Sequence, residues 1–133
     1  MKRIIFIITY ILFVFSTMYG STRIELYNMG LTSETCFAIS IQTADRVICN
    51  SESDKHTIVD SKFIDSLFIK MDSLVEDYCN INPDIRAVMR IYQDSYLHET
   101  IYFNSDNIIR GSCIYMMSED FLNTLYGKLG DLD

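Results

Sequence analysis

The sequence predicts an α+β domain in which a mostly antiparallel sheet carries two amphipathic helices on one face. Three observations support this prediction. Apolar side chains recur at helical spacing over residues 61–78 and again after residue 118. Several other segments alternate apolar and polar residues, as half-buried strands do. Short polar clusters separate these segments, and no internal repeat or long linker divides the chain.

Strands are expected before the first helix. Residues 23–28 alternate apolar and polar side chains and predict a half-buried strand. Residues 36–41 predict a second strand, and residues 46–49 predict its antiparallel partner in a hairpin. The polar residues 50–56 predict an exposed loop after that hairpin.

The clearest element is the amphipathic helix over residues 61–78. Its apolar side chains form one stripe, and charged or hydroxyl side chains fill the opposite face. Asp60 or Ser61 can cap its N-terminus, because a short polar side chain accepts hydrogen bonds from the free backbone N–H groups there. The helix is expected to end before Pro83, since proline cannot continue it.

The second half of the chain predicts a run of antiparallel strands and a closing helix. Asp94 and Ser95 suit a hairpin turn between the first two of these strands. Ser118 and the acidic residues after it favour a helix start, and Gly130 favours its end. The expected strands cover residues 85–93, 97–103, 108–109 and 113–117.

The first 20 residues have the layout of a secretory signal peptide. Lys2 and Arg3 precede an almost wholly apolar run over residues 4–15, and small or polar residues follow it. A membrane-spanning helix needs about 20 apolar residues, so the run is short for a permanent span. We expect cleavage after Gly20, with an uncleaved N-terminal anchor as the alternative.

Residues 21–133 then form a single α+β domain. No cysteine lies between residues 15 and 21, so a lipoprotein attachment site is not expected. The predicted location is therefore periplasmic or secreted. The formal net charge of −7 at pH 7 argues against nucleic acid or an anionic lipid surface as a partner.

Four cysteines lie in the predicted mature part, and an even number in an exported domain favours two disulfides. Three connectivities are possible. Cys36 and Cys49 flank the predicted hairpin, which favours pairing them with each other and Cys79 with Cys113. Neither the cysteines nor the two histidines have the spacing of a zinc site, so no metal is expected.

One face of the predicted sheet is a candidate binding surface. If the apolar side chains of residues 85–91 pack under the helices, the alternate residues lie on the open face. Tyrosine and arginine are enriched in binding surfaces, although strands also favour tyrosine for its propensity alone. The candidate residues are Arg86, Arg90, Tyr92, His98 and Tyr102.

No motif assigns a catalytic residue or a cofactor. The chain lacks the serine nucleophile motifs and the glycine-rich phosphate or dinucleotide loops. Glu99 shares its strand phase with Leu97 and Ile101, so its carboxylate is expected to point toward the core. It is either a strand-edge residue that reaches water or an acid with a perturbed pKa in a pocket.

Two continuous segments and one spaced pattern resemble a group of small exported bacterial proteins. The segments are DSKFIDSLFIKMDSL and DIRAVMRIYQDSYLHETIYF, and the pattern is a spacing of Gly, Tyr, Ser and Leu between Ile108 and Leu122. The resemblance covers roughly residues 58–126. It implies a strand, an amphipathic helix, a hairpin run and a closing helix. That group has no assigned activity, so the resemblance carries over no functional residue.

These observations favour an exported, non-enzymatic module that binds a protein or a glycan through the open sheet face. An acidic inhibitor or immunity-type protein is the first alternative, and it would use residues 51–54 with Asp65, Asp72 and Glu76. A small hydrolase is the second alternative, and it would need a concave site at His98 or Glu99.

Overall fold

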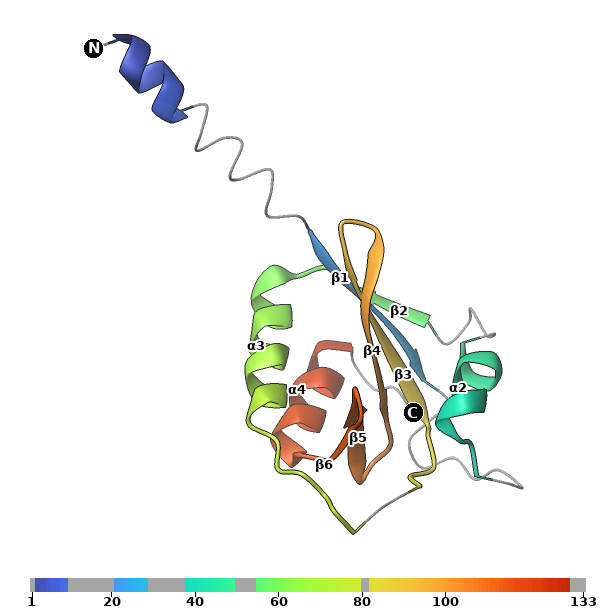
Figure 1. Ribbon diagram of the computed structural model, residues 1–133. Coiled ribbons are helices and arrows are strands. Elements are labelled where there is room, and N and C mark those ends of the chain that lie inside the picture. Colours follow the sequence, from blue (N-terminus) through green and yellow to red (C-terminus); the bar gives the residue numbers. More distant parts are fainter. Residues whose placement is uncertain (1, 10–20, 29–37, 50–54, 80–81, 130–133) are drawn as a thin grey trace.

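A computed structural model describes residues 2–9, 21–28, 38–49, 55–79 and 82–129 (Figure 1). It confirms the α+β prediction, with four helices and a six-stranded antiparallel sheet of order β2-β1-β3-β4-β5-β6. Residues 2–9 form the first helix. The other helices are α2 (Ile41–Ile48), α3 (Ser61–Asp72) and α4 (Glu119–Leu129). The strands are β1 (Thr22–Asn28), β2 (Lys55–Ile58), β3 (Ala87–Gln93), β4 (Tyr96–Phe103), β5 (Asn107–Arg110) and β6 (Cys113–Met116).

The helices α3 and α4 pack together on one face of the sheet, as the amphipathic patterns predict (Figure 1). The rings of Phe103 on β4 and Phe121 on α4 meet edge to face, with their centroids 6.5 Å apart. Asp60 caps α3 by accepting hydrogen bonds from the backbone N–H groups of Lys62 and Phe63. Burial of the apolar stripe, together with this cap, fixes α3 against the sheet.

The prediction of a hairpin over residues 36–49 is wrong where the structure describes it, because α2 forms there instead. Ala44 and Ile48 are buried one helical turn apart, and they pack with Ile39 and Val88. This spacing of four residues suits a helix better than a strand. Residues 36 and 37 of the expected first strand lie outside the described residues.

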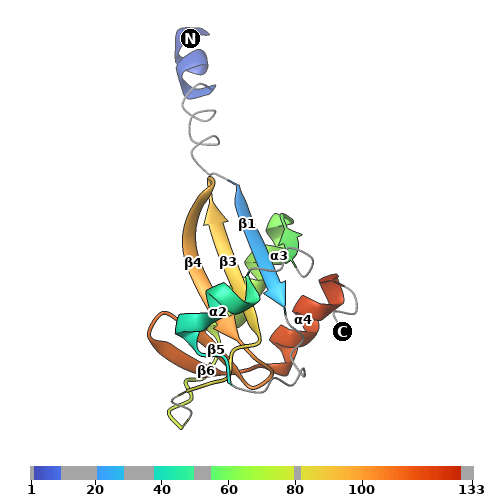
Figure 2. The same ribbon diagram turned by 90° about the vertical axis from the view of Figure 1, so that its right-hand side faces the viewer.

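The helix α2 lies across the face opposite α3 and α4 (Figure 2). This sheet face, named the α2 face below, is therefore only partly open. Because α2 covers part of this face, β1 is buried on both sides over most of its length. It is therefore not the half-buried strand that its alternation predicts. Glu25 and Tyr27, on the α2 face of β1, are only 8% and 6% exposed.

The predicted helix over residues 61–78 is too long, since α3 ends at Asp72. The Ser73 side chain donates a 2.9 Å hydrogen bond to the carbonyl of Lys70 and closes the last turn. The following residues, 75–77, run antiparallel beside β6, and an isolated bridge joins Glu76 to Tyr115. The apolar residues beyond 72 keep a helical spacing, but their backbone forms hydrogen bonds with the edge of the sheet instead of extending the helix.

The β3–β4 hairpin contains a tight turn and a register shift. Asp94 and Ser95 have φ angles of 51° and 72°, the left-handed values that a two-residue hairpin turn requires. Ile91 pairs with Glu99, whereas Tyr92 pairs with Leu97. His98 is therefore the extra residue of a bulge.

The helix of residues 2–9 projects away from the sheet (Figure 1). Ile4 to Ile8 are 52% to 81% exposed. Among the residues that the structure describes, no helix is long and apolar enough to cross a membrane.

Candidate functional site

The structure places four of the five candidate residues on the α2 face, with His98 near the β3–β4 hairpin. Arg90 and Tyr92 lie on β3, and Tyr102 lies on β4 opposite Val88. Arg86 differs, because it precedes β3, is only 8% exposed and forms an ion pair with Asp84. Arg86 therefore does not belong to an exposed binding surface.

Asp45 on α2 connects the helix to two strands. Its Oδ2 accepts a 3.0 Å hydrogen bond from the Tyr102 hydroxyl, and its Oδ1 lies 3.4 Å from Nη2 of Arg90. The Cys49 sulfur lies 4.0 Å from the same carboxylate. Burial, followed by the hydrogen bond to Asp45, raises the pKa of Tyr102 to about 12. Tyr102 and Arg90 thus hold α2 in place, which leaves them less available to a partner than the sequence predicts.

A chain of polar contacts continues from Arg90 across β1. The Arg90 guanidinium lies 5.3 Å from the centroid of the Tyr27 ring. The Tyr27 hydroxyl donates a 3.1 Å hydrogen bond to Glu25, whose carboxylate also pairs with Lys55 at 3.2 Å and Arg23 at 3.4 Å. Burial opposes ionisation of Glu25, but the hydrogen bonds from Lys55 and Tyr27 lower its pKa below the usual value. The Glu25 carboxylate is therefore paired with Tyr27, Lys55 and Arg23, whereas the Nε of Arg23 is buried without a hydrogen-bond partner among the described residues.

The part of the α2 face near the β3–β4 hairpin carries a different set of side chains. The Arg23 guanidinium lies 4.6 Å from the centroid of the Tyr92 ring. Leu97, the cross-strand neighbour of Tyr92, is 53% exposed, and His98 beside it is also exposed. We name Arg23, Tyr92, Leu97 and His98 the hairpin patch. It joins a stacked cation and aromatic ring to an exposed aliphatic side chain.

Glu99 lies in the phase of Ile91 and Ile101, on the face of α3 and α4, as the strand pattern predicts. The Nε of Arg110 lies 2.6 Å from Oε1 of Glu99, and Nη1 of Arg110 lies 2.9 Å from Oδ1 of Asp72. The carboxylate is thus half-buried in an ion-pair network. Glu99 is therefore paired with Arg110 and takes part in holding β4 to β5.

The acidic surface expected for an inhibitor is not a single helix face. Asp72 belongs to the network of Arg110, and Glu76 lies beyond the end of α3 in the bridge to β6. Only Asp65 of the three lies on the outer surface of α3 without such a role. Residues 51–54 of the predicted acidic surface lie outside the described residues.

The expected disulfides are not formed among the residues that the structure describes. Cys49, Cys79 and Cys113 are free thiols. The predicted Cys79–Cys113 bond is thus absent from this structure, and Cys36, the predicted partner of Cys49, lies outside the described residues. Burial raises the pKa of Cys49, so its thiol form is favoured.

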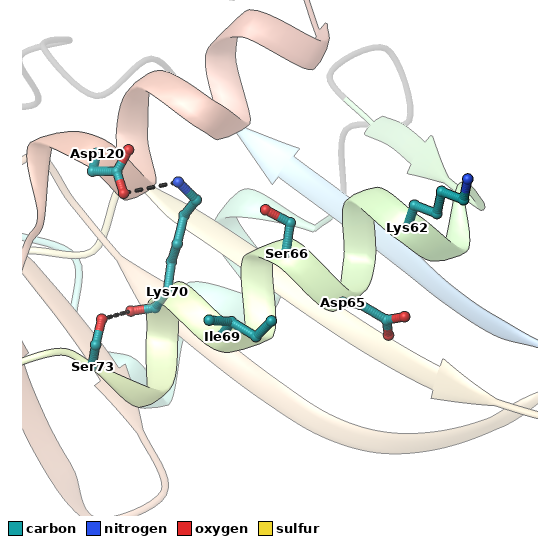
Figure 3. Close-up of a pocket in the computed structure, with 7 residues that line it drawn as sticks. All are labelled: Lys62, Asp65, Ser66, Ile69, Lys70, Ser73 and Asp120. Carbon is teal, nitrogen blue, oxygen red and sulfur yellow. Dashed lines mark hydrogen bonds and ion pairs between the residues drawn. The ribbon is translucent and has the colours of Figure 1, made fainter.

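A shallow depression follows the outer surface of α3 (Figure 3). The Lys70 ammonium turns toward Asp120 on α4 and forms an ion pair of 2.8 Å with it. None of the five candidate binding residues lines this depression, whereas Asp65, which belongs to the expected acidic surface, does. Its lining consists of Lys62, Asp65, Ser66, Ile69, Lys70, Ser73 and Asp120.

Sequence reasoning missed Asp45 and Arg23, because tertiary packing brings each of them to its partner. Asp45 lies one turn before Cys49 on a helix that was predicted as a hairpin. Arg23 pairs with Tyr92 across the sheet, a register that one sequence cannot specify.

The described residues contain no group of three or more His, Cys, Asp and Glu side chains that could hold a metal ion. Comparison with known protein families, curated proteins and solved structures finds no match to this chain. The arguments for its function therefore rest on the side chains themselves.

Proposed function

We propose that the protein is an exported, non-enzymatic interaction module that binds another protein through the hairpin patch. The single observation that carries this proposal is the stack of Arg23 on Tyr92 beside the exposed Leu97. Arginine and tyrosine are enriched among the residues that contribute most to protein interfaces. An exposed leucine next to them offers apolar area to a partner.

The position of α2 supports this choice over the larger open face that the sequence predicts. Asp45 accepts the hydrogen bond of the Tyr102 hydroxyl and pairs with Nη2 of Arg90, and α2 covers the apolar residues below them. The hairpin patch lies beyond these contacts. An Arg–Tyr stack is already ordered before binding, which reduces the entropy cost of fixing both side chains.

The N-terminal region supports export with cleavage. The apolar side chains of Ile4 to Ile8 are exposed, and their helix projects away from the sheet. Ser21 is tied to the domain, because its carbonyl accepts a hydrogen bond of 3.3 Å from the N–H of Asp94. Cleavage after Gly20 would therefore leave every residue of β1 in place.

Site-specific photo-crosslinking tests the proposal. A photoreactive residue replaces Leu97 in the full chain, which is then expressed in cells that process its N-terminus. We expect one dominant crosslinked protein, and we expect Tyr92→Ala to reduce its yield at least several-fold. A probe at Tyr78 is the matched control, because Tyr78 is 84% exposed but lies on the segment after α3.

The experiment separates binding from folding. The thermal midpoint of the Tyr92→Ala variant should stay close to that of the unaltered protein. The lower crosslinking yield then reports a loss of binding and not a loss of folding. Equal crosslinking from positions 97 and 78, or no loss with Tyr92→Ala, would overturn the proposal. Crosslinking only to glycans would indicate that the patch binds a carbohydrate. This result would also overturn the proposal of a protein partner.

A further inference from the structure

The guanidinium of Arg23 in the hairpin patch is held in place but is incompletely paired. Its side chain is 39% exposed, and its Nη2 lies 3.4 Å from Oε1 of Glu25. That carboxylate lies closer to Lys55, at 3.2 Å, and accepts a 3.1 Å hydrogen bond from Tyr27. Among the described residues, the Nε of Arg23 has no hydrogen-bond partner. Glu25 therefore satisfies Arg23 only in part.

Ion pairs on the other face of the sheet are shorter. The Nε of Arg110 lies 2.6 Å from Glu99, and the ammonium of Lys70 lies 2.8 Å from Asp120. Hydrogen bonds between a cationic nitrogen and a carboxylate are usually about 2.7–2.9 Å long. The 3.4 Å contact of Arg23 is longer than all of these, so its guanidinium can accept a closer carboxylate.

The stack on Tyr92 leaves the edge of this guanidinium for a ligand. The ring centroid of Tyr92 lies 4.6 Å from the guanidinium carbon of Arg23 and covers one of its faces. The N–H groups of a guanidinium point outward in its plane, where a carboxylate can bind two of them side by side. Stacking and carboxylate binding therefore use different parts of the same side chain.

An exposed apolar side chain continues the row. Arg23 on β1 pairs with Tyr92 on β3, which pairs with Leu97 on β4. Neighbouring strands lie about 4.8 Å apart, so the row spans about 10 Å, the length of a few extended residues. Because Leu97 is 53% exposed, a short segment can contact both the cation and the apolar group.

We propose that the hairpin patch binds a short acidic segment of its partner protein. One carboxylate of that segment pairs with the guanidinium of Arg23, and a neighbouring apolar side chain packs on Leu97. The inference rests on the proposed binding function and adds the chemistry of the partner.

The charge of the whole chain limits the length of this acidic segment. The formal net charge is −7, so a long polyanion such as a nucleic acid would be repelled by the rest of the molecule. Asp94, exposed in the adjacent turn, adds a further negative charge near the patch. A segment with one or two carboxylates can meet Arg23 without a large repulsion.

The first test identifies the bound segment. The partner peptide that is attached to a photoreactive residue at position 97 is sequenced by mass spectrometry after digestion. We expect Asp or Glu beside an apolar residue in this peptide. Replacing these carboxylates of the partner by amides should weaken its binding to the purified full chain at least several-fold.

Arg23→Gln and Arg46→Gln form a matched pair for the second test. Each changes the formal net charge from −7 to −8, but Arg46 is exposed on α2 and lies outside the hairpin patch. Arg23→Gln should weaken binding several-fold, whereas Arg46→Gln should leave it nearly unchanged. Raising the salt from about 0.1 M to about 1 M should also weaken binding of the unaltered chain, because the screening length falls from about 10 Å to about 3 Å.

The outcomes separate this inference from the proposed function. A dominant crosslinked protein whose attached segment lacks Asp and Glu, or equal binding by the two variants, would overturn the acidic segment and leave the binding function standing. Absence of a dominant crosslink at position 97 would overturn both. If Arg23→Gln lowers the thermal midpoint, the salt dependence and the amide-substituted partner still decide, since they leave this chain unaltered.

Discussion

The hydroxyl of Tyr102 donates a 3.0 Å hydrogen bond to Oδ2 of Asp45, and this bond ties β4 to α2. Tyr102→Phe removes the donor and keeps the ring, so it should lower the free energy of unfolding by about 1 kcal/mol. Chemical denaturation measures this change. Tyr96→Phe is the control, because Tyr96 is exposed at the hairpin end and should give no loss. An unchanged stability of Tyr102→Phe would mean that this bond does not hold α2.

The raised pKa of Tyr102 makes the stability depend on alkaline pH. In the unfolded chain the phenol ionises near pH 10, whereas in the folded protein its pKa is about 12. Between these values the unfolded state binds fewer protons, so the contribution of Tyr102 is complete below pH 10 and is lost as pH rises toward 12. Denaturation between pH 9 and pH 12 should show a shallower decline for Tyr102→Phe. Identical slopes would contradict the assignment.

Arg110 links β5 to β4 and α3 through Glu99 and Asp72. Arg110→Met leaves the half-buried Glu99 carboxylate without this cation, which should cost about 1–3 kcal/mol of unfolding free energy. The double variant Arg110→Met with Glu99→Met should recover most of this loss, since neither partner then remains unpaired. Denaturant unfolding of the two single variants and the double variant measures the coupling. Additive losses would show that the pair does not interact.

Ile48 and Val47 test whether residues 41–48 form a helix that covers the sheet. Ile48 is 2% exposed and packs in the core beside α2, whereas Val47 is 36% exposed. Ile48→Ala should therefore lower the free energy of unfolding by about 2–4 kcal/mol, and Val47→Ala by less than about 1 kcal/mol. Equal losses at both positions would argue against this helix orientation.

Removal of residues 1–20 should leave the folded domain unchanged. The side chains of residues 4–8 are exposed, and the sheet begins with Thr22. The truncated chain should match the full chain in its denaturant midpoint and its far-ultraviolet dichroism per folded residue. A clearly lower midpoint would show that the N-terminal segment stabilises the domain.

Much of the sheet follows from local patterns in the sequence. Residues 85–103 alternate strongly and carry the Asp94–Ser95 turn, so both strands and their connection could be predicted. The helix α3 has a cap at Asp60 and a clear apolar stripe. These signals are local, and a single sequence contains them.

The errors occur where tertiary contacts decide the structure. Leu74, Val75 and Tyr78 keep an apolar spacing that suits a helix, but the edge of β6 supplies backbone partners to residues 75–77 instead. The short strand β2 falls partly within residues predicted as a polar loop. It forms there because its backbone hydrogen-bonds to β1, a tertiary contact that its own residues do not reveal. Asp45 could not be placed beside Tyr102, since 57 residues separate them in the chain.

The two edges of the sheet differ in a way that restricts self-assembly. Residues 75–77 occupy hydrogen-bonding groups on the outer side of β6, whereas β2 pairs with β1 alone among the described strands. An unpaired strand edge is a template for a further strand. Among the strands that the structure describes, an added strand from a second copy or a foreign chain should therefore pair with β2 rather than with β6.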